Sequence, residues 1–148
     1  MPSTYLDLTC HVVFSTKHRQ PWIDELWRPD LHGYIGGTIR GLGAVPIAIG
    51  GVEDHVHILI GLRGNHALGD LIREIKKASH AWVEDTVRLK PFTWQEGYAG
   101  FSVSSDRKNT IVNYIAKQEE HHRRTSSLDE LKALLDEAGI IFNPAYLE

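Results

Sequence analysis

The chain has 148 residues, of which 42% are hydrophobic and 24% are charged, values typical of a globular protein large enough to bury a core. Its single cysteine excludes an internal disulfide and any zinc site built from several cysteines. It has neither an apolar run of membrane-spanning length nor a secretory leader, so we expect one cytoplasmic domain over residues 1–148 and no membrane partner.

The formal net charge of −3 hides an uneven distribution along the chain. Residues 1–124 hold 15 lysines and arginines against 14 acidic residues, whereas residues 125–148 hold one lysine against five acids. Local positive charge matters more for phosphate contacts than a high overall pI. A short cluster of basic residues, taken alone, is also typical of a solvated protein surface. The candidate phosphate contacts are Lys17, Arg19, Lys76, Lys77, Arg107, Arg123 and Arg124.

The first half of the chain predicts a strand, a helix and two further strands. Alternating apolar residues indicate the first strand, and His11 lies on the face opposite its apolar side. Pro29 suits the first turn of the helix, and Gly41 and Gly43 end it. The predicted ranges are about 4–14 for the first strand, 29–41 for the helix, 44–49 for the second strand and 56–60 for the third.

Two histidines stand at the entry to the third predicted strand and within it. Side chains two residues apart on a strand point to the same face, roughly 6.5–7 Å apart, so His55 and His57 can converge on one ion. Val56, Ile58 and Ile60 then face the core. This spacing is typical of a metal site, but two ligands do not define one, and ordinary polar residues at a strand entry are the alternative interpretation.

The second half of the chain predicts a helix, a fourth strand and two further helices. An amphipathic stripe indicates the first of these helices, and Ser105 is a candidate N-cap for the next. The last helix opens with a capping-box pattern, Ser127-Leu128-Asp129-Glu130. The predicted ranges are 68–82 for the first helix, 98–103 for the strand, and about 106–122 and 127–139 for the last two helices.

This order of elements predicts an α+β fold, a ferredoxin-like βαββαβ antiparallel sheet with two additional C-terminal helices and a core over about 4–124. The first and third strands are neighbours in that topology. We therefore expect His11, His55 and His57 to share the sheet face that the first two helices leave open. The helix after the fourth strand is expected to cover that face.

The helix predicted at 106–122 carries a tyrosine and a glutamine four residues apart. At about 100° per residue, Gln118 lies within about 40° of Tyr114 on the same side of the helix, about one turn further along. His121 and His122 extend this side. A core tyrosine and two histidines at a solvated helix end are the alternative interpretation.

In combination these features resemble one family. A ferredoxin-like domain with the strand motif His55-Val56-His57 and a later helical Tyr114 with Gln118 is similar to the single-tyrosine HUH transposases of the insertion-sequence-200/605 type. The first strand, Cys10-His11-Val12-Val13-Phe14-Ser15-Thr16-Lys17, also resembles that of the family. The stretches most similar to the small transposases associated with repetitive extragenic palindromes are Trp94-Gln95-Glu96-Gly97-Tyr98 and Gln118-Glu119-Glu120-His121-His122.

The resemblance implies a DNA transposase that cleaves and rejoins single-stranded DNA. In the family, two histidines and the glutamine hold Mg²⁺ or Mn²⁺, and the matching residues here are His55, His57 and Gln118. The matching nucleophile is Tyr114, whose attack would yield a 5′-phosphotyrosine and release a 3′-hydroxyl. The candidate accessory groups for proton transfer are His11 and His121.

The same resemblance implies a homodimer, whose active sites can combine two subunits, and a single-stranded DNA partner that forms a hairpin beside the cleavage site. The basic residues named above are then candidate DNA contacts. Trp82, Trp94 and Tyr98 are candidates to stack on bases, with burial in the core as the alternative. The acidic C-terminal segment has no assigned role.

Two other functions fit parts of the pattern. A non-catalytic nucleic-acid-binding module uses the same kind of sheet, but it presents aromatic side chains where this chain presents histidines. A hydrolytic metalloenzyme could use the strand histidines with His121 or His122 as ligands, and its cleavage would survive the loss of Tyr114.

Overall fold

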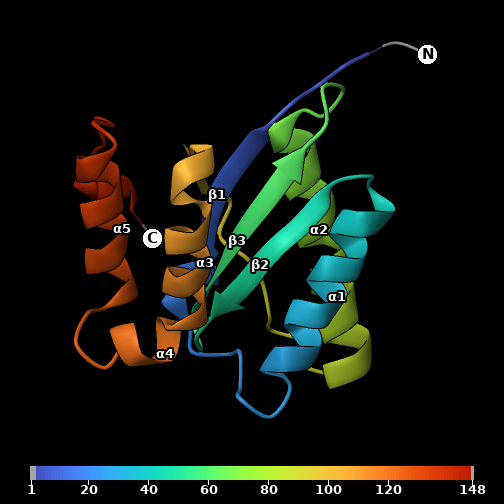
Figure 1. Cartoon of the computed structure of the whole chain (residues 1–148). Helices are drawn as coiled ribbons and strands as arrows, with labels where there is room; N and C mark the ends of the chain where they lie inside the picture. The colour runs from blue at the N-terminus through green and yellow to red at the C-terminus, as the bar shows by residue number, and fades with distance from the viewer. Residues whose placement is uncertain (1–2, 148) are drawn as a thin grey trace.

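The computed structural model describes residues 3–147, which form a four-stranded antiparallel sheet with helices on both faces (Figure 1). The strands are β1 (Leu8–Ser15), β2 (Val45–Gly51), β3 (His55–Leu62) and β4 (Ala99–Ser102). They lie in the order β2-β3-β1-β4, so the first and third strands are neighbours. The order of strands and helices along the chain confirms the predicted ferredoxin-like α+β arrangement.

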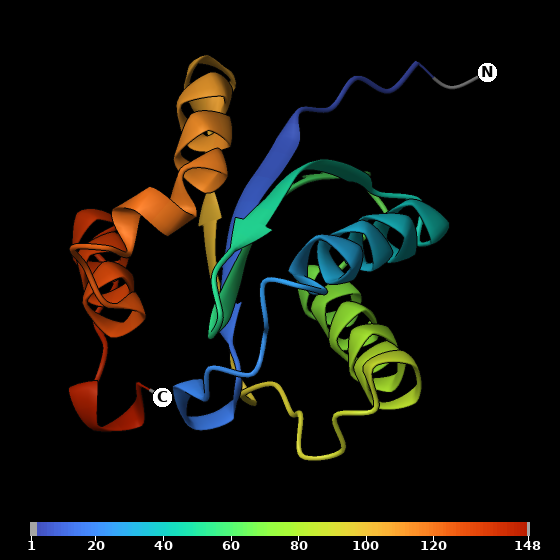
Figure 2. The same cartoon turned by 90° about the horizontal axis from the view of Figure 1, so that it is seen from below.

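Two helices cover one face of the sheet and enclose the core. They are α1 (Arg28–Gly41) and α2 (Leu68–Trp82), and Figure 2 shows both on the same side of the strands. Val12 and Phe14 of β1 are buried in this core, and each such burial contributes about 1.5–3 kcal/mol relative to exposure. Val56, Ile58 and Ile60 of β3 are buried in the same core. The alternation of β3 therefore turns its histidines to the other face.

Three shorter helices, α3 (Lys108–Ala116), α4 (Gln118–His121) and α5 (Ser127–Glu137), lie on that other side (Figure 2). Helix α3 packs on β2 and β3. At Gly50 of β2 a Cβ atom would lie 2.5 Å from the carbonyl oxygen of Ile115 and 2.8 Å from its Cγ2, closer than atoms pack. Glycine at this position therefore lets α3 lie directly on the sheet, as the open face requires.

Short turns connect these elements. The described part of the chain has 3₁₀ turns at Lys17–Arg19, Ser105–Arg107 and Pro144–Tyr146, and a π-helical turn over Val83–Val87 continues α2. The first strand begins at Leu8 and not near residue 4 as predicted, because residues 3–7 leave the sheet and are exposed. Among residues 3–147, no helix is long and apolar enough to cross a membrane.

The helix predicted as one segment over 106–122 is interrupted, so that prediction is wrong. Helix α3 ends at Ala116, and Lys117, with φ −104° and ψ 22°, departs from helical geometry before α4 begins at Gln118. The side chains of Gln118 and His122 make contacts with β3 and α5. Such contacts between distant segments leave no trace in helical periodicity.

Both predicted helix caps are also wrong. Ser105 does not cap α3, because its hydroxyl donates to a carboxylate of the N-terminal segment. Ser126, and not Ser127, caps α5, since the Ser126 hydroxyl accepts from the backbone N–H of Asp129 at 3.1 Å. Glu130 does not return to the start of the helix as in a capping box, and its side chain instead reaches the sheet.

The contact at Gly50 predicts a loss of stability. Gly50→Ala should lower the free energy of unfolding by about 1–3 kcal/mol, because the added methyl group displaces Ile115 and its helix. Urea unfolding followed by circular dichroism measures this change. Gly37→Ala on α1 is the matched control: no atom lies within 4 Å of its Cβ, and alanine there should be neutral or stabilising by up to about 1 kcal/mol. Equal stabilities of the two variants would contradict the close packing of α3.

Candidate active site

The open face of the sheet carries three histidines on two neighbouring strands. His55 and His57 lie on β3 and His11 lies on β1, and each is at most 2% exposed. His11 Nε2 lies 2.7 Å from His57 Nδ1, in a hydrogen bond whose direction depends on the tautomers. The structure thus brings together the three histidines that strand alternation predicted on one face.

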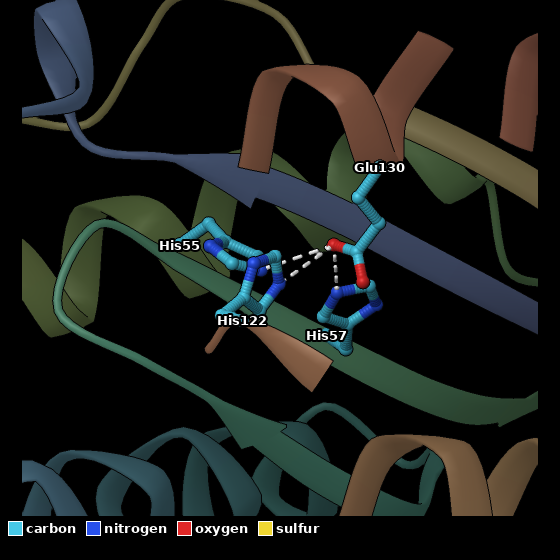
Figure 3. A group of neighbouring side chains, drawn as sticks. All are labelled: His55, His57, His122 and Glu130. Atoms are coloured by element: carbon cyan, nitrogen blue, oxygen red, sulfur yellow. Dashed lines mark hydrogen bonds and ion pairs between the residues drawn. The ribbon is translucent and has the colours of Figure 1, made fainter. Parts of the chain in front are cut away.

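A glutamate from α5 lies at the centre of the site, as Figure 3 shows. Glu130 is 3% exposed. Its Oε1 atom faces three imidazole Nε2 atoms, at 2.8 Å for His57, 3.2 Å for His55 and 3.3 Å for His122. A buried carboxylate needs such partners, since an unpaired buried charge is strongly destabilising. A charged contact therefore fixes α5 to the sheet.

The other carboxylate oxygen of Glu130 faces α3 and α4. The hydroxyl of Tyr114 donates to Oε2, and the side-chain amide of Gln118 donates to the same atom at 3.2 Å. The amide oxygen of Gln118 lies 3.2 Å from His55 Nε2 and 2.9 Å from His122 Nε2. The residue predicted as nucleophile and those predicted as metal ligands thus meet around one carboxylate.

His121 lies at the rim of this cluster. Its Nε2 atom is 3.2 Å from Oε2 of Glu130, without the alignment of a hydrogen bond, and its ring centroid is 5.4 Å from that of Tyr114. Both predicted accessory histidines are therefore close to the site, His11 behind His57 and His121 beside Tyr114.

Opposing effects set the charges of the site. Burial raises the pKa of Glu130, but hydrogen bonds from His122, His55 and His57 outweigh it and hold this pKa far below its usual range. Burial lowers the pKa of His55, but contacts with Asp54 and Glu130 outweigh it and raise this pKa to about 9. Without a metal ion, Glu130 is therefore ionised and His55 protonated at neutral pH, and His55 must lose a proton to bind a metal ion.

Three groups of the site, Tyr114, His57 and His11, are held neutral. Burial raises the pKa of Tyr114, and the carboxylate of Glu130 raises it further, above the usual range of a phenol. Burial lowers the pKa of His57 and lowers that of His11 to about 3. In this arrangement Tyr114 keeps its proton and donates it in a hydrogen bond to Glu130.

The donor atoms of the cluster fit a divalent metal ion. Nitrogens of His55, His57 and His122 and an oxygen of Glu130 lie within 4.8 Å of one another. Imidazole nitrogen with carboxylate oxygen suits Mn²⁺ and other first-row ions, whereas Mg²⁺ prefers oxygen atoms alone. Of the three predicted ligands, His55 and His57 belong to this cluster, and the side-chain oxygen of Gln118 lies beside it. The cluster also contains His122 and Glu130, which are not among those three.

Sequence reasoning does not identify two residues of the site. Asp54 accepts from His55 Nδ1 at 2.7 Å and so fixes the orientation of that ring. Glu130 lies in a stretch that matches an ordinary helix start, which hides its contact with the sheet. The one local signal for Asp54 is its position directly before His55. No local signal exists for Glu130.

The predicted DNA contacts differ in their surroundings. Lys76 is half-buried, and its ammonium group donates to the carbonyl oxygens of Gln95 and Gly97 at 2.8 and 2.7 Å, which fixes that loop. Arg19 turns inward and donates to the hydroxyl of Ser127 at 3.0 Å. The exposed members of the set are Lys17, Lys77, Arg107, Arg123 and Arg124.

The three aromatic candidates for base stacking also differ. Trp94 belongs to the core, since it is 5% exposed and its indole N–H donates to Ser79 Oγ at 2.9 Å. Trp82 packs on Tyr34, with ring centroids 5.6 Å apart. Tyr98 is 42% exposed and remains a candidate for a base contact.

Comparison with known families defines the class of this protein as a DNA transposase. The model of the family described as "Transposase IS200 like" matches residues 4–118, more than half of the chain. The chain belongs to this IS200-like transposase family. Membership supports DNA cleavage as the activity, and the match includes Tyr114 and Gln118 but ends before His122 and Glu130.

Two solved structures share the fold. A candidate transposase from Deinococcus radiodurans R1 superposes with a TM-score of 0.63 at 21% identity, covering 80% of this chain and 95% of the other. A REP-associated tyrosine transposase bound to a REP hairpin superposes with a TM-score of 0.62 at 19% identity, covering 82% of this chain and 73% of the other. At these identities the likeness shows the fold alone. No curated protein matches the chain.

Loss of the Glu130 carboxylate should weaken metal binding. Glu130→Gln keeps the shape of the side chain but removes its charge and a donor oxygen, so the affinity for Mn²⁺ should fall by about tenfold or more. Isothermal titration calorimetry measures this affinity. Asp136→Asn, at an exposed position of α5, is the matched control and should leave it unchanged. Equal affinities of wild type and Glu130→Gln would exclude Glu130 as a ligand.

Proposed function

We propose that this chain is a metal-dependent tyrosine transposase that cleaves and rejoins single-stranded DNA, near hairpins, through a 5′-phosphotyrosine intermediate. One observation carries the proposal: the Tyr114 hydroxyl donates to the same carboxylate, that of Glu130, which faces three imidazoles. A nucleophile and a set of metal-binding donors thus lie at one place. Family membership supports the reaction class.

The proposed metal site holds Mg²⁺ or Mn²⁺, and its mixed nitrogen and oxygen donors favour Mn²⁺. When bound, the ion supplies positive charge to the scissile phosphate. His11 orients His57 through their hydrogen bond, as groups behind metal-binding histidines commonly do. The residues that would hold the ion are His55, His57, His122, Glu130 and Gln118.

Tyr114 is the proposed nucleophile. Its phenol oxygen forms a bond to phosphorus while the bond from phosphorus to the 3′ oxygen of the preceding nucleotide breaks. The products are a 5′-phosphotyrosine and a free 3′-hydroxyl. Because the number of phosphoester bonds is unchanged, a second 3′-hydroxyl can reverse the step and join strands without ATP.

The attack requires the phenol proton of Tyr114 to leave. This proton already points at Oε2 of Glu130, so the carboxylate is the first acceptor. The pKa of Glu130 is held far below its usual range, which makes it a weak base and requires the proton to pass on. His121 Nε2, 3.2 Å from the same oxygen, is the neighbouring group that takes the proton once its ring turns into hydrogen-bond alignment.

The proposed substrate is a single strand with a hairpin beside the cleavage site, held in part by the exposed basic residues. The hairpin-bound structural neighbour supports this choice. We further propose that the protein is a cytoplasmic homodimer. Residues 1–148 are proposed to act as one domain, because α5 brings Glu130 to the sheet. Ring centroids of Tyr114 and His57 lie 5.6 Å apart in one chain, which supports active sites completed within each subunit.

A hydrolytic metalloenzyme is the second candidate, and the position of His122 in the cluster favours it. Such an enzyme would activate water for attack on phosphorus. It would form no covalent adduct and would not need the hydroxyl of Tyr114.

Tyr114→Phe should abolish both DNA cleavage and the covalent adduct while leaving hairpin binding nearly intact, because the substitution removes the hydroxyl alone. The substrate is 3′-labelled single-stranded DNA from the flanks of the gene, incubated with Mn²⁺ or Mg²⁺, and the readout is label on the protein in a denaturing gel. Tyr5→Phe, at a tyrosine that is 90% exposed, is the control and should keep full activity. Cleavage by Tyr114→Phe would favour the hydrolase.

A mixture of Tyr114→Phe and His57→Ala proteins tests whether subunits share active sites. Each variant lacks one group of a site that lies within one chain, so the mixture should stay inactive. Adduct formation restored by mixing would instead show that a homodimer builds each site from two chains. Light scattering of the mixture establishes whether the subunits associate.

A further inference from the structure

Two of the cavities that border the candidate active site are lined by Arg19. The larger, about 320 Å³, lies between the 95–100 loop, α5 and the segment 140–147, and is also lined by His55. The other, about 270 Å³, is lined by Asp54, His122 and Ser127. Arg19 therefore stands between the histidine cluster and a cavity that the proposed chemistry does not use.

The guanidinium of Arg19 has one edge free. Nη1 donates to Ser127 Oγ at 3.0 Å, whereas Nε and Nη2 are buried and have no hydrogen-bond partner among residues 3–147. The N–H groups of Nε and Nη2 point in parallel, the arrangement that binds two oxygens of a phosphate or carboxylate. The carboxylate of Asp54 does not fill this edge, because it accepts from His55 and Ser127. The nearby carboxylates of Asp54 and Glu130 offset the charge of Arg19, but they leave these two buried nitrogens without hydrogen-bond acceptors, which is costly.

The backbone turns Arg19 toward the site. His18 and Arg19 have φ angles of 56° and 54°, in the left-handed region that residues other than glycine rarely adopt. The turn is held by Arg19 N–H, which donates to the Thr16 carbonyl at 3.0 Å, and by the Thr16 hydroxyl, which donates to the Gln20 carbonyl at 2.7 Å. Strained conformations of this kind persist where the surroundings enforce them, and they concentrate at functional sites.

The larger cavity has walls that are largely apolar and aromatic. Its side chains include Tyr98, Leu131, Leu135, Phe142 and Tyr146. The loop that forms one wall is fixed, because the side-chain oxygen of Gln95 accepts from the backbone N–H of Ser15 at 2.6 Å and from its hydroxyl at 2.8 Å. Nucleic-acid bases stack on such aromatic side chains without strong sequence preference.

We propose that Arg19 and this cavity form a nucleotide subsite for the bound single strand. On DNA binding the buried, unpaired edge of the guanidinium opens and binds a backbone phosphate neighbouring the scissile one, and the base of the same nucleotide enters the cavity. The inference rests on the proposed DNA cleavage, since it places the strand that Tyr114 attacks. It gives Arg19 a different role from the exposed basic residues, which are proposed to contact phosphates at the surface.

The test measures binding of short hairpin DNA by fluorescence anisotropy in EDTA, so that cleavage does not interfere. A series of substrates carries one abasic nucleotide at each position beside the cleavage site. One position should weaken binding by about tenfold, as expected for loss of a stacked base. Tyr98→Ala should reduce this sensitivity. Equal binding of all abasic substrates would overturn the base cavity.

Arg19→Gln and Arg19→Lys should both weaken binding by about tenfold, because lysine keeps the charge but lacks the two parallel donors. Arg40→Gln removes an exposed charge on α1 and is the matched control. Thermal unfolding verifies that each variant is folded. Equal affinities of Arg19→Gln and Arg40→Gln would overturn the phosphate contact. Inorganic phosphate could also compete with DNA in the wild type but not in Arg19→Gln, while all abasic substrates bind equally. This result would show an anion site and overturn the nucleotide assignment.

The two proposals can fail separately. In one outcome, an abasic nucleotide and Arg19→Gln each weaken DNA binding, but the protein forms no adduct on any DNA. That outcome would support the subsite and contradict the transposase chemistry. A Tyr114 adduct without base sensitivity would do the reverse.

Discussion

The contact between the Glu130 carboxylate and the imidazoles of the sheet is the interaction on which the rest of the site depends. One oxygen of this carboxylate joins α5 to β3, and the other accepts from Tyr114 of α3. A buried carboxylate among imidazoles and a phenol is stable as a set and costly when a partner is lost. Helix α5 is therefore part of the candidate site, although the family match ends at residue 118.

Local backbone features bring the partners of this carboxylate into range. The alternation of β3 turns His55 and His57 away from the core, and Gly50 lets α3 lie directly on β2. The interruption at Lys117 then turns α4 so that Gln118 meets His55. Each feature is ordinary alone. Together they place a phenol, an amide and the imidazoles around one position, as the proposed metal-assisted attack on a phosphate would use them.

The sheet and the shared face of its histidines could be predicted from the sequence, because periods of 2 and about 3.6 residues are local properties. The family could also be predicted from the motifs of residues 55–57 and 114–118, and the match of its model to residues 4–118 confirms it. The contact of Glu130 with His57 could not, because 73 residues separate them and the capping pattern indicates a helix start. The inward turn of Arg19 was equally hidden, since it depends on left-handed backbone angles that no nearby glycine marks. The roles of Tyr114 and of the ligands remain predictions.

The most direct test of this site is a crystal structure of the protein grown with Mn²⁺, measured at a wavelength that reveals the anomalous signal of manganese. We expect an anomalous peak within bonding distance of His55, His57, His122 and Glu130, with the Tyr114 hydroxyl facing it. No peak at this cluster in a protein that cleaves DNA with Mn²⁺, with Glu130 still bound to the imidazoles, would contradict a shared site for metal and nucleophile.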